Sequence, residues 1–211
     1  MAGKGVIGER AAVSEIFLFF SALFDGPPPA SVTARRINEI FDDLRHAVGL
    51  TGAREAIDPR DLAEDYESLF LIPDPASPLS LYSTQYCADK AGAGEDFVMD
   101  VTILAASLQV PWRKQEFVPG RSYPVTPDHV SVEFALLSVL VQLEPSADIA
   151  GRSARAWVYR LSEELICALW HIERILRGLK RSRRPRAYEE LSAVALSYVT
   201  AYRDLAVPTP H

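Results

Sequence analysis

The stretch that decides the fold is residues 126–141, which read Thr-Pro-Asp-His-Val-Ser-Val-Glu-Phe-Ala-Leu-Leu-Ser-Val-Leu-Val. A threonine followed by a proline is a helix-start signal, because the hydroxyl can cap free amides and proline suits the first helical turn. The residues behind it are strongly apolar, and several recur at helical spacing, namely Val132, Leu136, Leu137, Leu140 and Val141. The stretch therefore predicts a buried helix over about 127–144.

Apolar residues recur at three- and four-residue spacing along most of the remaining chain, which predicts further helices. We expect them over about 9–24, 31–48, 95–108, 153–179 and 187–206. Another helix should begin at Asp58-Pro59, again a capping residue followed by proline. No stretch reads convincingly as a strand.

Two irregular stretches interrupt this helical pattern. Residues 73–93 are proline-rich, with a short turn expected around Tyr82–Tyr86, and residues 110–126 contain three prolines and a glycine. The predicted fold class is all-α: a single compact helical domain of about seven helices in two halves joined by a hinge loop. The N-terminal half covers about 1–110, the hinge about 110–126 and the C-terminal half about 127–211.

Composition excludes several classes of protein. The 211 residues are 48% hydrophobic and 24% charged, with a net charge of −6, which is typical of a globular chain and too apolar for a disordered one. Two cysteines are too few for a disulfide scaffold, and Cys87 and Cys167 lack the spacing of a metal site. The acidic balance also argues against a general nucleic-acid binder.

The first 24 residues are the only stretch that resembles a targeting segment. Glu15 interrupts their apolar run, and Asp25-Gly26-Pro27 follows it without a suitable cleavage site. The run is also too short to span a bilayer. We therefore expect a buried first helix, no membrane insertion, and a cytoplasmic protein with free thiols.

Charge is distributed unevenly along the chain. Residues 1–120 hold 18 acidic and 10 basic side chains, whereas residues 121–211 hold 10 acidic and 12 basic ones. An acidic first half suits a cationic partner, although a solvated acidic surface is the more common explanation.

Two segments carry the most specific information. One is Asp65-Tyr66-Glu67-Ser68-Leu69-Phe70, followed by a proline-rich connection that contains Tyr82, Ser83 and Tyr86. The other is Pro127-Asp128-His129-Val130-Ser131-Val132-Glu133-Phe134, which opens an apolar helix. Together with the length, helical character, few cysteines and acidic balance, these segments resemble the TorD/DmsD family of redox enzyme maturation proteins. Members of that family are cytoplasmic chaperones for molybdenum-containing oxidoreductases.

The resemblance implies a binding protein rather than an enzyme, with no cofactor of its own. Its partners would be the apo form of a molybdoenzyme catalytic subunit and the twin-arginine leader of that subunit, held for cofactor insertion before export. Cofactor-insertion proteins are further partners that it suggests, and the chain would be a monomer or a domain-swapped dimer. In the family, the pair that matches Asp128 and His129 is implicated in leader recognition.

The residues themselves suggest how such a site would work. Asp128 and His129 are expected in the first turn of their helix, where His129 and Glu133, four apart, share one face. They would form either a local hydrogen-bonded anchor or a polar patch that receives a peptide. Carboxylates can hold guanidinium groups by paired hydrogen bonds, so the candidate acids are Asp65, Glu67, Asp128 and Glu133.

Aromatic residues are the candidates for contact with the apolar part of a leader. They are Tyr66, Phe70, Tyr82 and Tyr86. Tyr66 and Phe70 share a helix face, so plain core packing is a strong competing interpretation for them. The two tyrosines of the proline-rich connection are better placed to meet a ligand.

An enzyme is the main alternative. Asp128, His129 and Glu133, with His171 and Glu173 of another helix, would supply oxygen and nitrogen ligands for a metal-dependent hydrolase or oxidase. The spacing lacks the paired Glu-x-x-His pattern of helical metal sites, and no nucleophile motif is present. A helical assembly adaptor that binds no leader is the third class.

The run from Lys180 to Arg186 holds five cations in seven residues. It lacks a glycine-rich phosphate loop and interleaved aromatics, so a solvated connection between helices explains it better than nucleic-acid binding. Clients that reduce trimethylamine oxide, dimethyl sulfoxide, nitrate or chlorate, and a dehydrogenase of the same superfamily, all remain open at this point. Binding of molybdenum cofactor or guanine nucleotide is also open.

Overall fold

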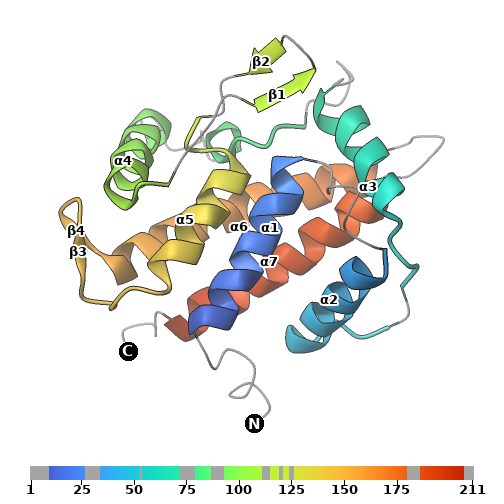
Figure 1. The fold of residues 1–211 in the computed structure, drawn as a ribbon, viewed down its shortest axis with the longest axis horizontal. Coiled ribbons are helices and arrows are strands. Elements are labelled where there is room, and N and C mark those ends of the chain that lie inside the picture. The colour runs from blue at the N-terminus through green and yellow to red at the C-terminus, as the bar shows by residue number, and fades with distance from the viewer. Residues whose placement is uncertain are drawn as a thin grey trace.

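The structure, a computed structural model, describes residues 10–26, 34–52, 54–71, 79–86, 93–110, 115–118, 121–123, 126–179 and 186–206. Within these ranges it is mostly helical (Figure 1). The α-helices are α1 (Arg10–Asp25), α2 (Ala34–Ala47), α3 (Pro59–Tyr66), α4 (Ala93–Leu108), α5 (Val130–Leu140), α6 (Ala154–Gly178) and α7 (Arg186–Ala206). A π-helical turn, η1 (Glu67–Leu71), extends α3, and a 3-10 turn, η2 (Ser83–Gln85), lies before α4. The expected all-α fold class is confirmed.

The prediction that the chain has no strands is wrong in detail. A short antiparallel hairpin pairs β1 (Gln115–Val118) with β2 (Arg121–Tyr123) inside the stretch expected to be irregular. A second pairs β3 (Asp148–Ile149) with β4 (Arg152–Ser153) through Ala150 and Gly151, which both have the positive φ of a two-residue hairpin turn. Strands of two to four residues are too short to show an alternating pattern.

Helices α1 and α5 lie side by side and run in opposite directions, with α6 and α7 behind them (Figure 1). The Ser21 hydroxyl donates to the carbonyl of Ser131 at 2.8 Å, near the end of α1 and the start of α5. Beyond the other end of α5, the Gln142 amide donates to the Ser14 hydroxyl at 2.6 Å. These two bonds pin the antiparallel pair at both ends.

Aromatic packing fills the space among α1, α5 and α7. The rings of Phe20 and Phe24 of α1 lie 5.3 and 5.8 Å from that of Phe134 of α5, and all three side chains are fully buried. Tyr198 of α7 closes the cluster, with its ring 5.9 Å from that of Phe20. Because an aromatic side chain buries a large apolar area, this cluster anchors the first helix of the chain to its last two-fifths.

Helix α5 begins later than predicted. Its N-cap is His129, with extended backbone angles (φ −73°, ψ 134°), and not Thr126, whose carbonyl instead accepts a turn bond from the His129 amide. The backbone around His129 is held by the segment 79–86 in a short antiparallel bridge between Tyr82 and His129. A residue paired in this way cannot also be helical, so a contact across the chain overrides the local start signal. The helix also ends earlier, at Leu140.

The remaining helices lie close to their predicted ranges. Asp58 caps α3, accepting a hydrogen bond from the Arg60 amide at 2.8 Å, and Pro59 is the first helical residue, as predicted. Among the described helices, none combines the length and the apolar character needed to cross a membrane.

Candidate functional site

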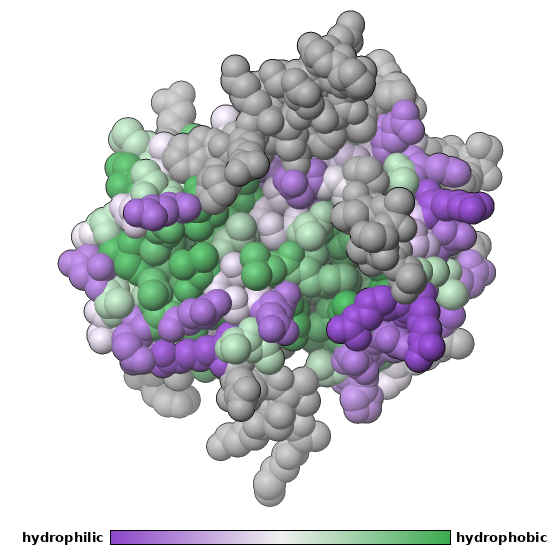
Figure 2. Space-filling view, viewed as in Figure 1, coloured by the Kyte–Doolittle hydropathy of each residue, from purple (hydrophilic) through white to green (hydrophobic). Residues whose placement is uncertain are grey.

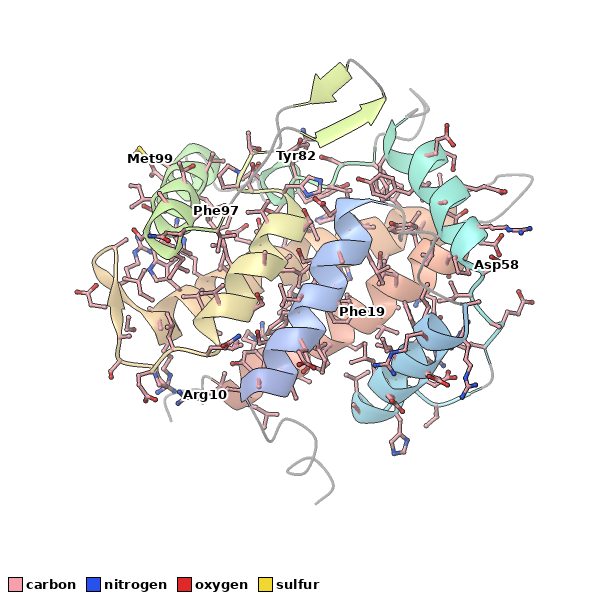
Figure 3. All side chains as sticks on the ribbon, in the orientation of Figure 1. Arg10, Phe19, Asp58, Tyr82, Phe97 and Met99 are labelled. Atoms are coloured by element: carbon pink, nitrogen blue, oxygen red, sulfur yellow. The ribbon has the colours of Figure 1, made fainter. Side chains whose placement is uncertain are left out.

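The candidate site is built where the segment 79–86 lies against the start of α5. The amide of Val130 donates to the carbonyl of Leu81 at 2.8 Å, and the amide of Ser83 donates to the carbonyl of Asp128 at 3.0 Å. Tyr82 lies beside the first turn of α5, at the end of the molecule opposite Arg10 (Figure 3). The two motifs singled out in the sequence therefore meet. The segment 79–86, which follows the first motif, contacts residues 128–130 of the second.

Asp128 precedes α5 and does not lie in its first turn, in contrast to the prediction. Only 4% of the residue is exposed. Its two carboxylate oxygens accept hydrogen bonds from the hydroxyls of Thr84 and Thr126. No cation among the described residues forms an ion pair with it, so hydroxyl groups alone replace the water that the carboxylate loses on burial.

His129 is equally buried and acts as the cap of α5. Its Nδ1 lies 2.7 Å from the Ser131 hydroxyl and 3.3 Å from the Ser131 amide, and the Tyr82 ring packs edge-on against the imidazole at 5.2 Å. Burial lowers the pKa of His129 to about 4, although the nearby Asp128 charge acts in the opposite direction. The imidazole is therefore neutral at pH 7.

Glu133 is fully buried. One of its carboxyl oxygens accepts from the hydroxyl of Ser83, and the other has no hydrogen-bond partner among the described residues. Burial, with smaller contributions from the charges of Asp128 and Glu164, raises the pKa of Glu133 well above its ordinary value, despite the opposing hydrogen bond from Ser83. His129 and Glu133, which the spacing suggested as a pair, thus bond to different serines.

A chain of polar contacts leads from this buried group to the surface. The Ser131 hydroxyl lies between Nδ1 of His129 and Oδ1 of Asp25, the latter at 3.3 Å. Asp25 is the last residue of α1 and is exposed. The Tyr66 hydroxyl donates to the backbone carbonyl of Asp25 at 3.1 Å, which brings α3 to the same place.

Sequence reasoning missed this carboxylate and the hydroxyl groups that hold the predicted acids. The residues it missed are Asp25, Ser83, Thr84, Thr126 and Ser131. Ser83, Thr84 and Ser131 make their contacts across the chain and so carry no local signal of them. Thr126 lies only two positions from Asp128, and its local signal predicted a helix cap instead. Asp25 did carry one, since an acid at the C-terminal end of a helix opposes the helix dipole and calls for another explanation.

The other predicted site residues make different contacts. Tyr66 is buried and packs on Phe70 with ring centroids 5.3 Å apart, as the core-packing interpretation expected, and Phe70 in turn packs on Tyr188. Burial raises the pKa of Tyr66, as do the nearby Asp25 and Tyr82. Asp65 is buried, and its charge helps to raise the pKa of Tyr188, which burial raises most. Two further residues are more open: Glu67 is exposed on η1, and Tyr82 is half-buried.

Tyr86 faces α6 rather than α5. Its ring stacks on the imidazole of His171 at 5.3 Å, and its hydroxyl donates to the carbonyl of Ser80 at 2.9 Å. Glu173, two residues beyond His171, pairs with Arg177. In the ranges that the structure describes, no three His, Cys, Asp or Glu side chains lie close enough together to hold a metal ion. Residues 180–185 of the basic run lie outside the described residues, and Arg186 begins α7.

Comparison with known proteins identifies the family. The family model described as nitrate reductase delta subunit matches residues 33–166, which is more than half of the chain and includes both motifs. No curated protein and no solved structure matches the chain significantly. The matched range contains Tyr66, Tyr82, Asp128, His129 and Glu133, the residues that meet or lie next to the junction of the 79–86 segment with α5. The chain therefore belongs to the nitrate reductase delta subunit family, part of the TorD/DmsD-like group of chaperones that assemble molybdoenzymes and are not catalytic themselves.

Proposed function

We propose that this chaperone binds the twin-arginine leader and the apo form of a nitrate reductase-type catalytic subunit in the cytoplasm. It would hold that subunit until the molybdenum cofactor has been inserted, and only then release it for export. Recognition is reversible and involves no covalent step. The bound chaperone would delay export, because a leader that it covers cannot engage the export machinery. The family supports the association with such a subunit, and the leader as its target is our proposal.

The observation that carries the proposal is how Asp128 is buried and bonded. This buried carboxylate is stabilised by two threonine hydroxyls, and no cation among the described residues neutralises it. A carboxylate in a region of low dielectric interacts more strongly with a cation than the same group does in water. Such an interaction favours the approach of a guanidinium group to the surface beside η2 and α5.

Apolar surface lies next to this charge. Figure 2 shows apolar residues gathered over α4, α5 and α1 on the face that the view presents. Large side chains that contribute to the exposed apolar surface of α1 and α4 include Leu18, Met99 and Ile103. Apolar surface on the same face as a polar site suits a peptide in which two arginines precede an apolar run.

Co-purification of the client tests the proposal. The catalytic subunit of the cognate molybdoenzyme, produced in a host that makes no molybdenum cofactor, should be recovered with the tagged chaperone. Removing about the first thirty residues of the client, the length of an export leader, should reduce that recovery strongly. Equal recovery of the full-length and shortened clients would show that the leader is not the target, and would favour an assembly adaptor.

A further inference from the structure

The buried acids of the candidate site are poorly placed to touch a peptide. Asp128 is 4% exposed with both oxygens bonded to threonines, and Glu133 is fully buried. A guanidinium that bound either one directly would have to displace these internal bonds and open the junction of the segment 79–86 with α5. A carboxylate that is accessible from solvent and connected to the same cluster is a better direct contact.

Asp25 has these properties. It is exposed at the C-terminal end of α1 and is linked to His129 through the Ser131 hydroxyl. Its backbone is held by the Tyr66 hydroxyl, so three helices determine where it lies. Helix stability does not explain an acid at this position, because the helix dipole disfavours negative charge there.

Apolar surface continues from Asp25 along one face of α1. Ala22 and Leu18 precede Asp25 by three and seven residues, so all three lie along one face of the helix, and all are exposed, Leu18 by 50%. At 1.5 Å per residue the stripe extends about 10 Å from Asp25 to Leu18. Half-buried Ala135 and Val139 lie on α5, the antiparallel neighbour of α1.

We propose that Asp25 binds an arginine of the leader and that the stripe Leu18–Ala22 receives the apolar run that follows the arginine pair. The order of the two features matches the peptide, with the charged contact at one end and apolar surface continuing from it. Asp128 and His129 then act as positioning residues. His129 holds Ser131, which contacts Asp25, and Asp128 holds the residues just before α5 through its bonds to Thr84 and Thr126. This inference rests on the proposed leader binding and adds the residue that makes the ionic contact.

Titration calorimetry on the full chain tests the inference with two peptides. One is a client leader with its two arginines, and the other carries two glutamines instead. Asp25→Asn keeps the size of the side chain and an oxygen that can accept from the Ser131 hydroxyl, but it removes the charge. It should weaken the arginine peptide about tenfold, the loss expected for one charge-assisted hydrogen bond, and change the glutamine peptide by less than about twofold.

The matched control is Glu15→Gln. Glu15 is exposed on the same helix, about 15 Å from Asp25, and its substitution changes the net charge by the same amount. Affinity for the arginine peptide should not change in this control. An equal loss of affinity in both variants would mean that the net charge of the protein, rather than a contact with Asp25, attracts the peptide, and it would overturn the inference.

Charge reversal and the apolar stripe provide independent checks. Asp25→Lys should bind a peptide with two glutamates in place of the arginines more tightly than the unaltered chain does. Leu18→Gln should weaken the arginine and glutamine peptides equally, whereas Leu205→Gln, at a similarly exposed residue of α7, should weaken neither. Absence of these effects overturns the assignment.

The outcomes also separate this inference from the proposed function. If the unaltered chain binds the arginine peptide and Asp25→Asn binds it equally well, leader recognition stands and Asp25 is not its contact. If the unaltered chain binds no leader peptide, the proposed function fails and the inference fails with it.

Discussion

Burial shifts the pKa values of two site residues in opposite directions, lowering that of His129 and raising that of Glu133. These two shifts affect how the stability of the fold depends on pH. Burial lowers the pKa of His129 from 6.5 to about 4, so the unfolded chain binds a proton there before the folded chain does. The stability that neutral His129 contributes is present above about pH 6.5 and is lost as the pH falls through about 4. A shift of this size corresponds to about 3 kcal/mol.

Replacing His129 tests this directly. Asparagine is a good helix cap but does not titrate, so His129→Asn should remove up to about 3 kcal/mol of the fall in the free energy of unfolding between pH 7 and pH 4. Urea unfolding at several pH values measures that fall. His46→Asn, at an exposed residue near the end of α2, is the matched control for the loss of an imidazole. An identical fall in His129→Asn and the unaltered chain would mean that His129 is not the titrating group.

Glu133 gives the opposite dependence. Its raised pKa means that the folded chain retains a proton which the unfolded chain releases above about 4.5, so the stabilising effect is complete at low pH and is lost as the pH rises. Glu133→Gln has nearly the same shape and can still accept a hydrogen bond from Ser83. We compare the melting temperature of this variant with that of the unaltered chain at each pH. The difference should be more favourable to the variant at pH 8 than at pH 5 by about 2–4 °C, which is the shift that about 1 kcal/mol produces in a chain of this size.

Thermal melts monitored by circular dichroism measure that difference. Glu15→Gln, at an exposed position, serves as the control and should show no such gain. If Glu133→Gln lowered the melting temperature more at pH 8 than at pH 5, relative to the unaltered chain at the same pH, a protonated Glu133 would be contradicted.

At this scale the sequence pointed to residues that the structure brings together, but not to the contacts that hold them. Asp128, His129 and Glu133 could be identified because they follow a helix-start signal in a motif. Their burial could not be predicted, because the groups that bury and satisfy them, such as Thr84, lie far away in the sequence, 44 positions from Asp128. The same is true of the connection from Asp25 to Ser131, which spans 106 positions.

Among the elements, helices with strong local signals were predicted most accurately. Asp58 and Pro59 start α3 as expected, because the capping bond is made within three residues of chain and depends on little else. The start of α5 was predicted three residues too early, because the bridge from Tyr82 competes with the helix for the backbone of His129. The two hairpins were missed because their strands have at most four residues.

The cap of α3 provides a prediction at the scale of the element. Asp58→Ala removes the bond to the Arg60 amide and should lower the free energy of unfolding by about 1 kcal/mol. Asp58→Asn, which retains an oxygen that can accept this bond, should change it by only a few tenths of that amount. Denaturant unfolding distinguishes the two variants. Equal losses would show that charge, rather than capping, is what Asp58 contributes.

In the whole molecule, helices that are distant in sequence are packed together. The aromatic side chains of α1 pack on those of α5 and α7, so the predicted N-terminal half contacts the predicted C-terminal half through Phe20, Phe134 and Tyr198. The candidate site lies at one end of this contact, where α1 ends and α5 begins (Figure 1). The division into two halves with a hinge at 110–126 remains a prediction, and only residues 115–118 and 121–123 of the central part of that loop are described.

The central claim is that the chain recognises a leader with two arginines. Its most direct test is titration calorimetry of the purified chain against the leader of its cognate catalytic subunit, compared with the same peptide carrying Lys-Gln in place of the arginine pair. We predict micromolar or tighter binding of the leader and a sharp loss of affinity for the Lys-Gln peptide. Failure of the folded protein to bind the leader, or equal affinity for both peptides, would contradict the proposed function.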